Sequence, residues 1–189
     1  TYQESQGKMV SSIKARYDNI VQILTRLGYI ENEKLTDIGR FTTKIFSNEI
    51  EVSQLFYSNF ELDEYSMLLV LAALVYEERK DIEFQKMYPS KDVKKLEIAI
   101  RTHPYLKKGS WYKNLEKMTA LMRPAYEQKK FIEILKDTNM LEGDLIRFYM
   151  QVLDKLEQID RALLDHSKIA MIRNCKTIIK GCLEGIHIF

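Results

Sequence analysis

The sequence predicts an all-α fold, built as a compact helical bundle, and three observations support this. Apolar residues recur at intervals of three and four over several segments, which is the spacing of one face of an α-helix. The 189 residues include only 7 Gly and 3 Pro, fewer chain breakers than the many turns of an all-β fold use. Hydrophobic residues make up 46% and charged residues 30%, which is typical of a globular protein.

The N-terminal segment predicts a long helix followed by a hairpin. Gly28 ends the helix, because glycine favours the backbone conformation found at helix C-termini. Two short strands joined by a tight turn are then predicted in the stretch GYIENEKLT. A helix followed by such a hairpin is the back half of a winged helix, so we assign residues 1–38 to the C-terminal part of a winged-helix domain. The apolar stripe of the helix consists of Val10, Ile13, Tyr17, Ile20, Leu24 and Leu27.

Three capped helices are predicted next. Thr36 or Asp37 caps the first by accepting hydrogen bonds from free backbone N–H groups. Asn48 and Asp63 are placed to cap the second and the third. The third helix contains an apolar run over residues 67–76, which is shorter than the roughly 20 residues that span a bilayer. This run therefore predicts a buried helix and no membrane contact.

The rest of the chain is again predicted to be helical. A polar connector over residues 77–92 comes first, and we expect it to be the most mobile segment. Further helices are predicted over residues 93–100, 111–136, 143–164 and 167–183. Pro124 should kink or break the second of these. Residues 39–189 thus form the predicted helical-bundle domain.

The charge balance limits how the protein can bind nucleic acid. The net charge is only +2, from 29 Lys and Arg against 27 Asp and Glu. A protein that binds nucleic acid through charge alone is far more basic. Any nucleic-acid contact must therefore come from a local patch or from a larger chain.

The cysteines and histidines predict neither disulfides nor a metal site. Cys175 and Cys182 stand one heptad apart in an apolar pattern, so we expect two buried, reduced thiols and a cytoplasmic protein. His103, His166 and His187 are scattered without metal-ligand spacing. The opening TYQESQGK lacks the charged-then-apolar layout of a signal peptide.

Sequence signatures of catalysis are missing. The chain has no Gly-rich phosphate loop with its Lys and Ser/Thr and no Gly-x-Ser-x-Gly nucleophile elbow. Glu77 and Glu78 are neighbouring carboxylates, but they follow a helix and are best explained as solvated surface. We therefore expect no catalytic residue in this chain, and a hidden enzyme is the alternative with the least support.

One polar helix face could bind a strand. On the helix that begins at Gly143, polar residues recur every three or four positions opposite the apolar side. Such a row of donors and acceptors could line a channel and touch bases or phosphates. From the pattern alone, a solvated face with intrahelical ion pairs, such as Asp144 with Arg147, is the more common explanation. The row consists of Asp144, Arg147, Gln151, Asp154, Lys155 and Gln158.

Several motifs occur in a characteristic order along the chain. Gly39 and Arg40 follow the predicted hairpin, an Asn48–Glu49 pair precedes the apolar helix, and Phe131 opens a later segment. That segment ends in Glu-Gly-Asp-x-x-Arg, formed by Glu142, Gly143, Asp144 and Arg147. In order and spacing these motifs resemble the DSHCT domain that ends the exosome-assisting and antiviral RNA helicases. The resemblance covers nearly the whole chain.

The resemblance implies a role in guiding RNA. In the family, the helix opened by Glu-Gly-Asp is the ratchet helix, which lies across the RNA path beyond the motor domains. By position, Arg147, Gln151, Asp154 and Lys155 are the expected contacts. Gln151 stands where the family often has a basic residue, so a charge-assisted contact becomes a neutral hydrogen bond. The fragment is expected to need no cofactor, since ATP and Mg belong to the motor domains of the parent.

The resemblance also implies partners, and alternatives remain open. The expected partners are single-stranded RNA, the RecA-like motor domains of the parent chain and an RNA-degrading complex. The substrate could instead be DNA, because the contacts that distinguish the 2′-hydroxyl cannot be inferred from one helix. A helical protein-interaction module that docks an RNA-processing complex is the rival from another class, and it predicts an exposed apolar patch.

Overall fold

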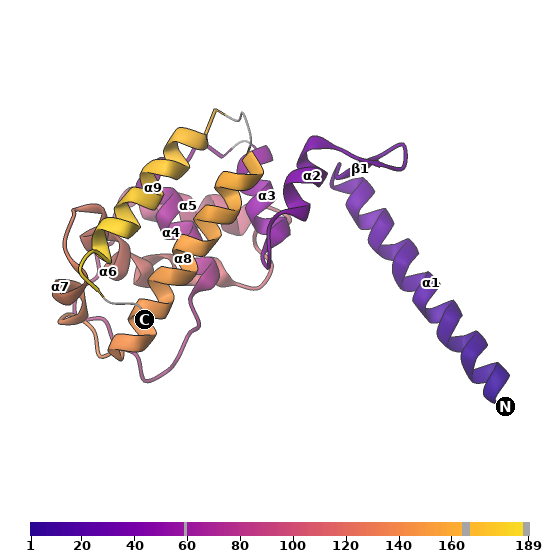
Figure 1. Cartoon of the computed structure of the whole chain (residues 1–189), viewed down its shortest axis with the longest axis horizontal. Coiled ribbons are helices and arrows are strands. Elements are labelled where there is room, and N and C mark those ends of the chain that lie inside the picture. Colours follow the sequence, from indigo (N-terminus) through magenta and orange to yellow (C-terminus); the bar gives the residue numbers. More distant parts are fainter. Residues whose placement is uncertain (59, 164–166, 187–189) are drawn as a thin grey trace. The chain divides into compact units, whose positions relative to one another are not determined.

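The computed structural model describes residues 1–58, 60–163 and 167–186, and it divides the chain into two compact units (Figure 1). Unit 1 is Thr1–Thr43 and unit 2 is Lys44–Phe189. His166, His187 and the expected helix end at residue 164 lie outside the described residues. Within the described ranges, no helix is long and apolar enough to cross a membrane.

Unit 1 contains the predicted helix and hairpin. Helix α1 (Tyr2–Arg26) is followed by its C-cap Leu27 and then by Gly28, whose φ of 76° lies in the left-handed region. Strands β1 (Ile30–Glu31) and β2 (Lys34–Leu35) pair antiparallel. The two residues between them both have positive φ, as a two-residue hairpin turn requires. The hairpin and the short helix α2 (Asp37–Thr43) that follows it are confirmed.

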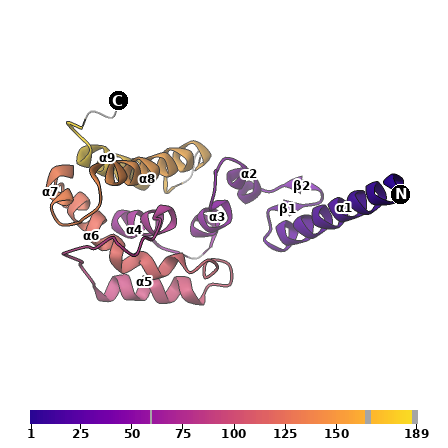
Figure 2. The same ribbon diagram turned by 90° about the horizontal axis from the view of Figure 1, so that it is seen from below.

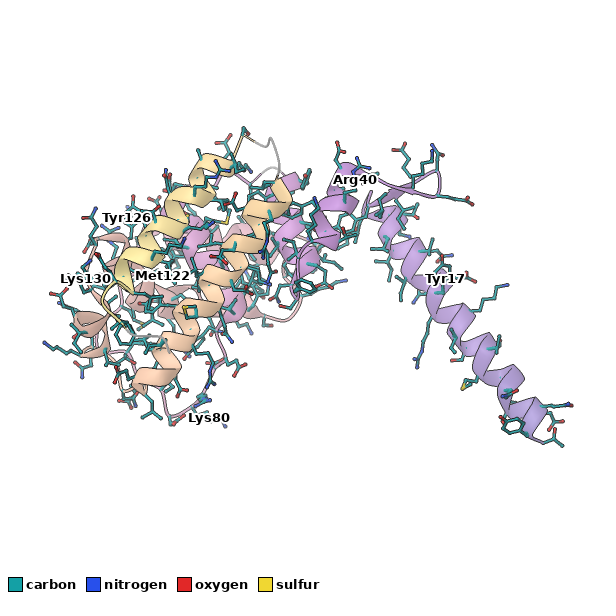
Figure 3. The ribbon with its side chains drawn as sticks, in the orientation of Figure 1. Tyr17, Arg40, Lys80, Met122, Tyr126 and Lys130 are labelled. Carbon is teal, nitrogen blue, oxygen red and sulfur yellow. The ribbon has the colours of Figure 1, made fainter. Side chains whose placement is uncertain are left out.

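The Gly39–Arg40 motif locks the hairpin to α2. The hydroxyl of Thr36 caps α2 by accepting a hydrogen bond from the N–H of Gly39 at 3.2 Å. A Cβ at Gly39 would lie 2.1 Å from the carbonyl oxygen of buried Tyr29, so only glycine permits this approach. Arg40, labelled in Figure 3, donates through Nη1 to the carbonyl of Leu35 at 2.8 Å.

Helix α1 keeps its apolar stripe exposed. The helix has no buried residue, and Tyr17, labelled in Figure 3, is 67% exposed. Val10, Ile13 and Ile20 are at least 55% exposed. The amphipathic pattern thus predicted the helix correctly, but the described residues provide no core for its apolar side.

Unit 2 is a layered helical bundle, as predicted. The apolar run lies in α4, whose residues from Met67 to Ala73 are all buried. Figure 2 shows α4 in the middle layer, with α8 and α9 on one side and α5 on the other. The helices of unit 2 are α3 (Glu49–Tyr57), α4 (Glu64–Val75), α5 (Lys91–Thr102), α6 (Leu115–Tyr126), α7 (Phe131–Leu135), α8 (Glu142–Leu163) and α9 (Ile169–Cys182), with a 3-10 turn at Trp111–Asn114.

Two expected helix boundaries differ from the structure. Asp63 caps α4 as predicted, with Oδ1 accepting from the N–H of Ser66 at 2.7 Å. Asn48 occupies the cap position of α3, but it has a φ of 52° and makes no side-chain capping bond. The helix expected over residues 111–136 consists of a 3-10 turn, α6 and α7, and the break lies after Tyr126, two residues beyond Pro124. Proline at position 124 removes one backbone hydrogen-bond donor from α6, but the helical turns before it still form.

The connector over residues 77–92 is held in place by hydrogen bonds, in contrast to the expected mobility. The N–H of Glu83 donates to Oδ1 of Asn139 at 2.7 Å. Nδ2 of Asn139 donates to the carbonyl of Asp81 at 2.6 Å, and Phe84 forms a β-bridge with Thr138. These bonds hold the connector beside the chain that leads into α8.

Candidate nucleic-acid interface

Helix α8 is anchored through its apolar side. Leu145, Tyr149 and Val152 are completely buried. The hydroxyl of Tyr149 donates to the carbonyl of Leu121 in α6 at 2.6 Å, and burial raises the pKa of Tyr149. The ring of Phe131, the motif residue that opens α7, packs edge-on against Tyr149 at 6.4 Å between ring centroids. This packing fixes the rotation of α8 and therefore the direction of its polar face.

Three of the expected contact residues form one exposed row along α8. Arg147, Gln151 and Asp154 are separated by four and three positions and are all exposed. This spacing places them on the same face of the helix. The structure thus confirms that the three residues share one exposed face, while their contact with nucleic acid stays a prediction.

The row borders two adjoining hollows, which we call the α8 groove. The first encloses about 200 Å³ and the second about 720 Å³. Both are lined by Arg147 and Gln151 on α8 and by residues 75–77 at the end of α4. Asp154, Phe46 and Asn48 line only the second hollow. A groove with a mixed polar and aromatic lining suits an extended polar ligand better than a compact apolar one.

Tyr76 forms an aromatic side of the groove. Its ring lies 6.2 Å from that of Phe84 in the connector and 6.3 Å from that of Phe148 in α8, measured between centroids. Burial raises the pKa of the Tyr76 hydroxyl, so it stays protonated and can donate a hydrogen bond. Val75, Tyr76 and Glu77 at the end of α4 therefore line the groove together with Arg147 and Gln151 of α8.

Arg147 keeps its guanidinium available. The expected partner, Asp144, pairs instead with Arg79 of the connector at 3.5 Å. Among the described residues, none of the ion pairs involves Arg147. The expected Asp144–Arg147 pair is replaced because the connector brings a competing arginine to Asp144, which a helical pattern cannot show. The row thus holds an arginine whose charge is not neutralised by direct pairing.

Lys155 lies elsewhere than expected. It is only 3% exposed, and its Nζ donates to the carbonyl and the hydroxyl of Ser47 at 2.8 and 3.2 Å and to the carbonyl of Phe46. Burial lowers the pKa of Lys155. The segment before α3 covers this part of the helix, so the ammonium group serves internal contacts. We therefore leave Lys155 out of the candidate row.

Gln158 is buried in the same way. Its Oε1 accepts from the backbone N–H of Phe46 at 2.9 Å, and its Nε2 donates to Oδ2 of Asp154 at 2.8 Å. Sequence reasoning did not single out Phe46, which is 76% exposed at the edge of the groove. Phe46 is a large apolar residue directly before the polar residues Ser47 and Asn48, and this pattern is the sequence signal that could have identified it.

The remaining motif residues lie at helix ends. Glu142 and Gly143 open α8, where the carboxylate of Glu142 suits the positive end of the helix dipole. A Cβ added at Gly143 would meet no atom within 4 Å, so packing inside the described chain does not demand glycine there. Glu49 is the first residue of α3, and Asn48 precedes it at the groove.

The two cysteines offer no reactive thiol. Cys175 and Cys182 are free and buried in α9. Burial raises the pKa of Cys175 to about 12 and that of Cys182 to about 11. Thiols with such pKa values stay protonated at neutral pH and are poor nucleophiles. Among the described residues, no group of His, Cys, Asp and Glu is placed to hold a metal ion.

Comparison with known proteins gives two matches. A family model described as the DSHCT (NUC185) domain matches residues 32–180. The chain is also 24% identical over 183 residues to a protein of Schizosaccharomyces pombe named ATP-dependent RNA helicase mtr4. The match covers 88% of this chain and 16% of that relative, so the chain corresponds to a small part of the helicase.

Proposed function

Because the chain belongs to the DSHCT (NUC185) domain family, we propose that it is a non-catalytic guide for single-stranded RNA within an ATP-dependent RNA helicase. Arg147, Gln151 and Asp154 contact the strand as it passes along the α8 groove. The distant relative supports RNA as the substrate, since its name is that of an RNA helicase.

The observation that carries this proposal is that Tyr76 and Arg147, whose guanidinium forms no ion pair with the described residues, line the same groove. Both side chains line both hollows of the groove. A guanidinium binds phosphate or base edges, while an aromatic ring offers a surface on which bases stack. The pair therefore combines the two kinds of contact that single-strand binding uses.

The other two positions of the row make weaker contacts. Gln151 is neutral and can both donate and accept hydrogen bonds. Asp154 repels phosphate and suits amino groups of bases, and one of its oxygens already accepts from Gln158. With a net charge of +2, the chain alone should hold RNA weakly and lose it as salt increases. Weak contacts allow the strand to slide.

The motor lies outside this chain in the proposal. Hydrolysis of ATP with Mg in RecA-like domains of the parent moves the strand, and the α8 groove keeps it aligned. The protein works in the cytoplasm and delivers RNA to a degrading complex. Family membership and the relative's name support an RNA helicase as the parent, and this chain's own residues contribute the groove.

A second function is favoured by one specific observation in unit 1. The stripe of Val10, Ile13, Tyr17 and Ile20 is exposed on α1, as a helical protein-interaction module would require. Replacing Ile13 and Tyr17 by Glu separates the two functions. Loss of a protein partner with intact RNA binding favours the interaction module, whereas intact partner binding argues against it.

The test of the guide function compares two activities of a helicase that contains this chain. The double variant Arg147→Ala, Gln151→Ala should lose strand unwinding by about tenfold or more while keeping most of its RNA-stimulated ATPase. Arg101→Ala, which removes an exposed arginine from α5, is the matched control and should change neither activity. If the double variant unwinds as well as the wild type, the row is ordinary solvated surface.

A further inference from the structure

The ring of Phe46 and the side chain of Leu141, which is 71% exposed, are the most exposed of the large apolar side chains described in unit 2. Phe46 is 76% exposed, whereas Phe56, Phe131 and Phe148 are at most 4% exposed. A single exposed apolar residue is common on a protein surface. Phe46 differs because of how its backbone is held and where its ring lies.

Two buried side chains of α8 hold the backbone of Phe46. Its N–H donates to Oε1 of Gln158 at 2.9 Å, and its carbonyl accepts from Nζ of Lys155. Both of these side chains are at most 5% exposed. Burying an ammonium group is costly unless it is hydrogen-bonded, so this arrangement fixes the segment at a definite place. The exposed ring is thus carried by an anchored backbone.

The ring also lies on the path of the proposed strand. Phe46 lines the same hollow of about 720 Å³ as Arg147, Gln151 and Asp154. Lys155, which holds it, is eight residues beyond Arg147, or about 12 Å along the helix axis. Stacked bases are about 3.4 Å apart. A base at Phe46 would therefore belong to a different nucleotide from the one that Arg147 holds.

We propose that Phe46 is a stacking platform for one nucleobase of the strand that Arg147 holds. Stacking on an exposed aromatic ring is sequence-tolerant, because every base has a flat π-face. It also provides affinity that the small net charge does not. This inference rests on the proposed guide function and adds a second, uncharged contact to it.

The experiment uses the chain and a fluorescent single-stranded RNA of about 12 uridines, a length within the usual range of such sites. Phe46→Ala and Phe46→Leu should each weaken binding by about fivefold or more, while Phe46→Trp should bind at least as well as the wild type. Ile132→Ala on α7, where Ile132 is 56% exposed, is the control for loss of an exposed apolar side chain and should bind normally.

Salt dependence and an abasic strand identify the kind of contact. Phe46→Ala should leave the slope of log affinity against log salt unchanged, whereas Arg147→Ala should reduce the magnitude of that slope by about 0.7, the value for one phosphate contact on a single strand. An abasic sugar–phosphate strand of the same length should bind Phe46→Ala and the wild type equally. A Phe46→Leu variant that binds like the wild type, or an equal loss with the abasic strand, overturns stacking.

The outcomes also separate this inference from the guide function. If Arg147→Ala weakens binding and Phe46→Ala does not, the guide function stands and the stacking platform is wrong. If the wild-type chain does not bind RNA even at low salt, both are wrong. Circular dichroism melting of each variant shows whether it is folded, and variants of so exposed a ring should melt as the wild type does.

Discussion

The backbone N–H of Phe46 donates a hydrogen bond of 2.9 Å to the carboxamide of Gln158, which lies 112 positions later in the chain. The same carboxamide donates to Asp154 at 2.8 Å. One buried side chain therefore connects the segment before α3 to the exposed row of α8. The stability of this connection and the binding of the row can be tested separately.

Lys155→Met should destabilise unit 2 by about 1–3 kcal/mol, because the carbonyl groups of Phe46 and Ser47 would lose a charged donor. The measurement is the free energy of unfolding in urea. Lys180→Met, on the exposed side of α9, is the control and should stay within about 0.5 kcal/mol of the wild type. Equal stability of the two variants would show that the buried ammonium contributes nothing.

Asp160 should make the stability depend on acid pH. Its pKa is lowered from the ordinary 3.8, first by the hydrogen bond from Lys176 and further by Arg173. A carboxyl with a lowered folded pKa binds fewer protons when folded, so its stabilisation is present above 3.8 and lost as pH falls below that value. Asp160→Asn should therefore cost up to about 1 kcal/mol at neutral pH.

Urea unfolding of the wild type and Asp160→Asn across pH tests this sign. The difference between them should shrink as pH falls through the region below 3.8. Glu61→Gln, at an exposed residue between α3 and α4, serves as a comparison for removing a carboxylate. A difference that grows in acid would contradict the assignment to the Lys176 pair.

Gly39→Ala should unfold the hairpin of unit 1, because the new Cβ would lie 2.1 Å from the carbonyl oxygen of Tyr29. We expect a cost of about 2 kcal/mol or more, visible as faster hydrogen exchange at the amide of Thr36, which donates to that carbonyl. Gly7→Ala, whose Cβ meets no atom within 4 Å, should instead stabilise α1 by about 0.5–1 kcal/mol. Unchanged exchange in Gly39→Ala would mean that the hairpin shifts without cost.

Gln151→Arg should strengthen RNA binding by restoring a positive charge to the row. Each phosphate neutralised on a single strand adds about 0.7 to the magnitude of the salt slope. Titration of single-stranded RNA at several salt concentrations measures this. Gln6→Arg, which makes the same change on exposed α1, controls for a general rise in charge. A similar gain in both variants would mean that the groove has no special role.

Local sequence signals predicted much of the fold. The Asp63 cap, the hairpin turn and the buried run of α4 each depend on residues close together in the chain, so propensity and periodicity were sufficient. The row of Arg147, Gln151 and Asp154 could also be predicted from the sequence, because helical spacing determines which residues share a face.

The parts that sequence reasoning missed depend on distant segments. The helical pattern put Lys155 on the exposed face, and only the fold shows that Phe46 and Ser47 cover it from 109 and 108 positions away. The partner of Asp144 is likewise Arg79, 65 positions earlier. Periodicity describes one helix at a time and contains no information about which loop crosses it.

The side chain of Asn139 accepts a hydrogen bond from the N–H of Glu83 and donates one to the carbonyl of Asp81, and this pair of bonds has a mechanical consequence. The two bonds join the chain leaving α4 to the chain entering α8, and these helices form the two banks of the groove. A force on a bound strand would act on both helices together, so the α8 groove would resist opening at this end. Lengthening either loop by one residue would shift these hydrogen bonds and change the width of the α8 groove without replacing any residue that lines it.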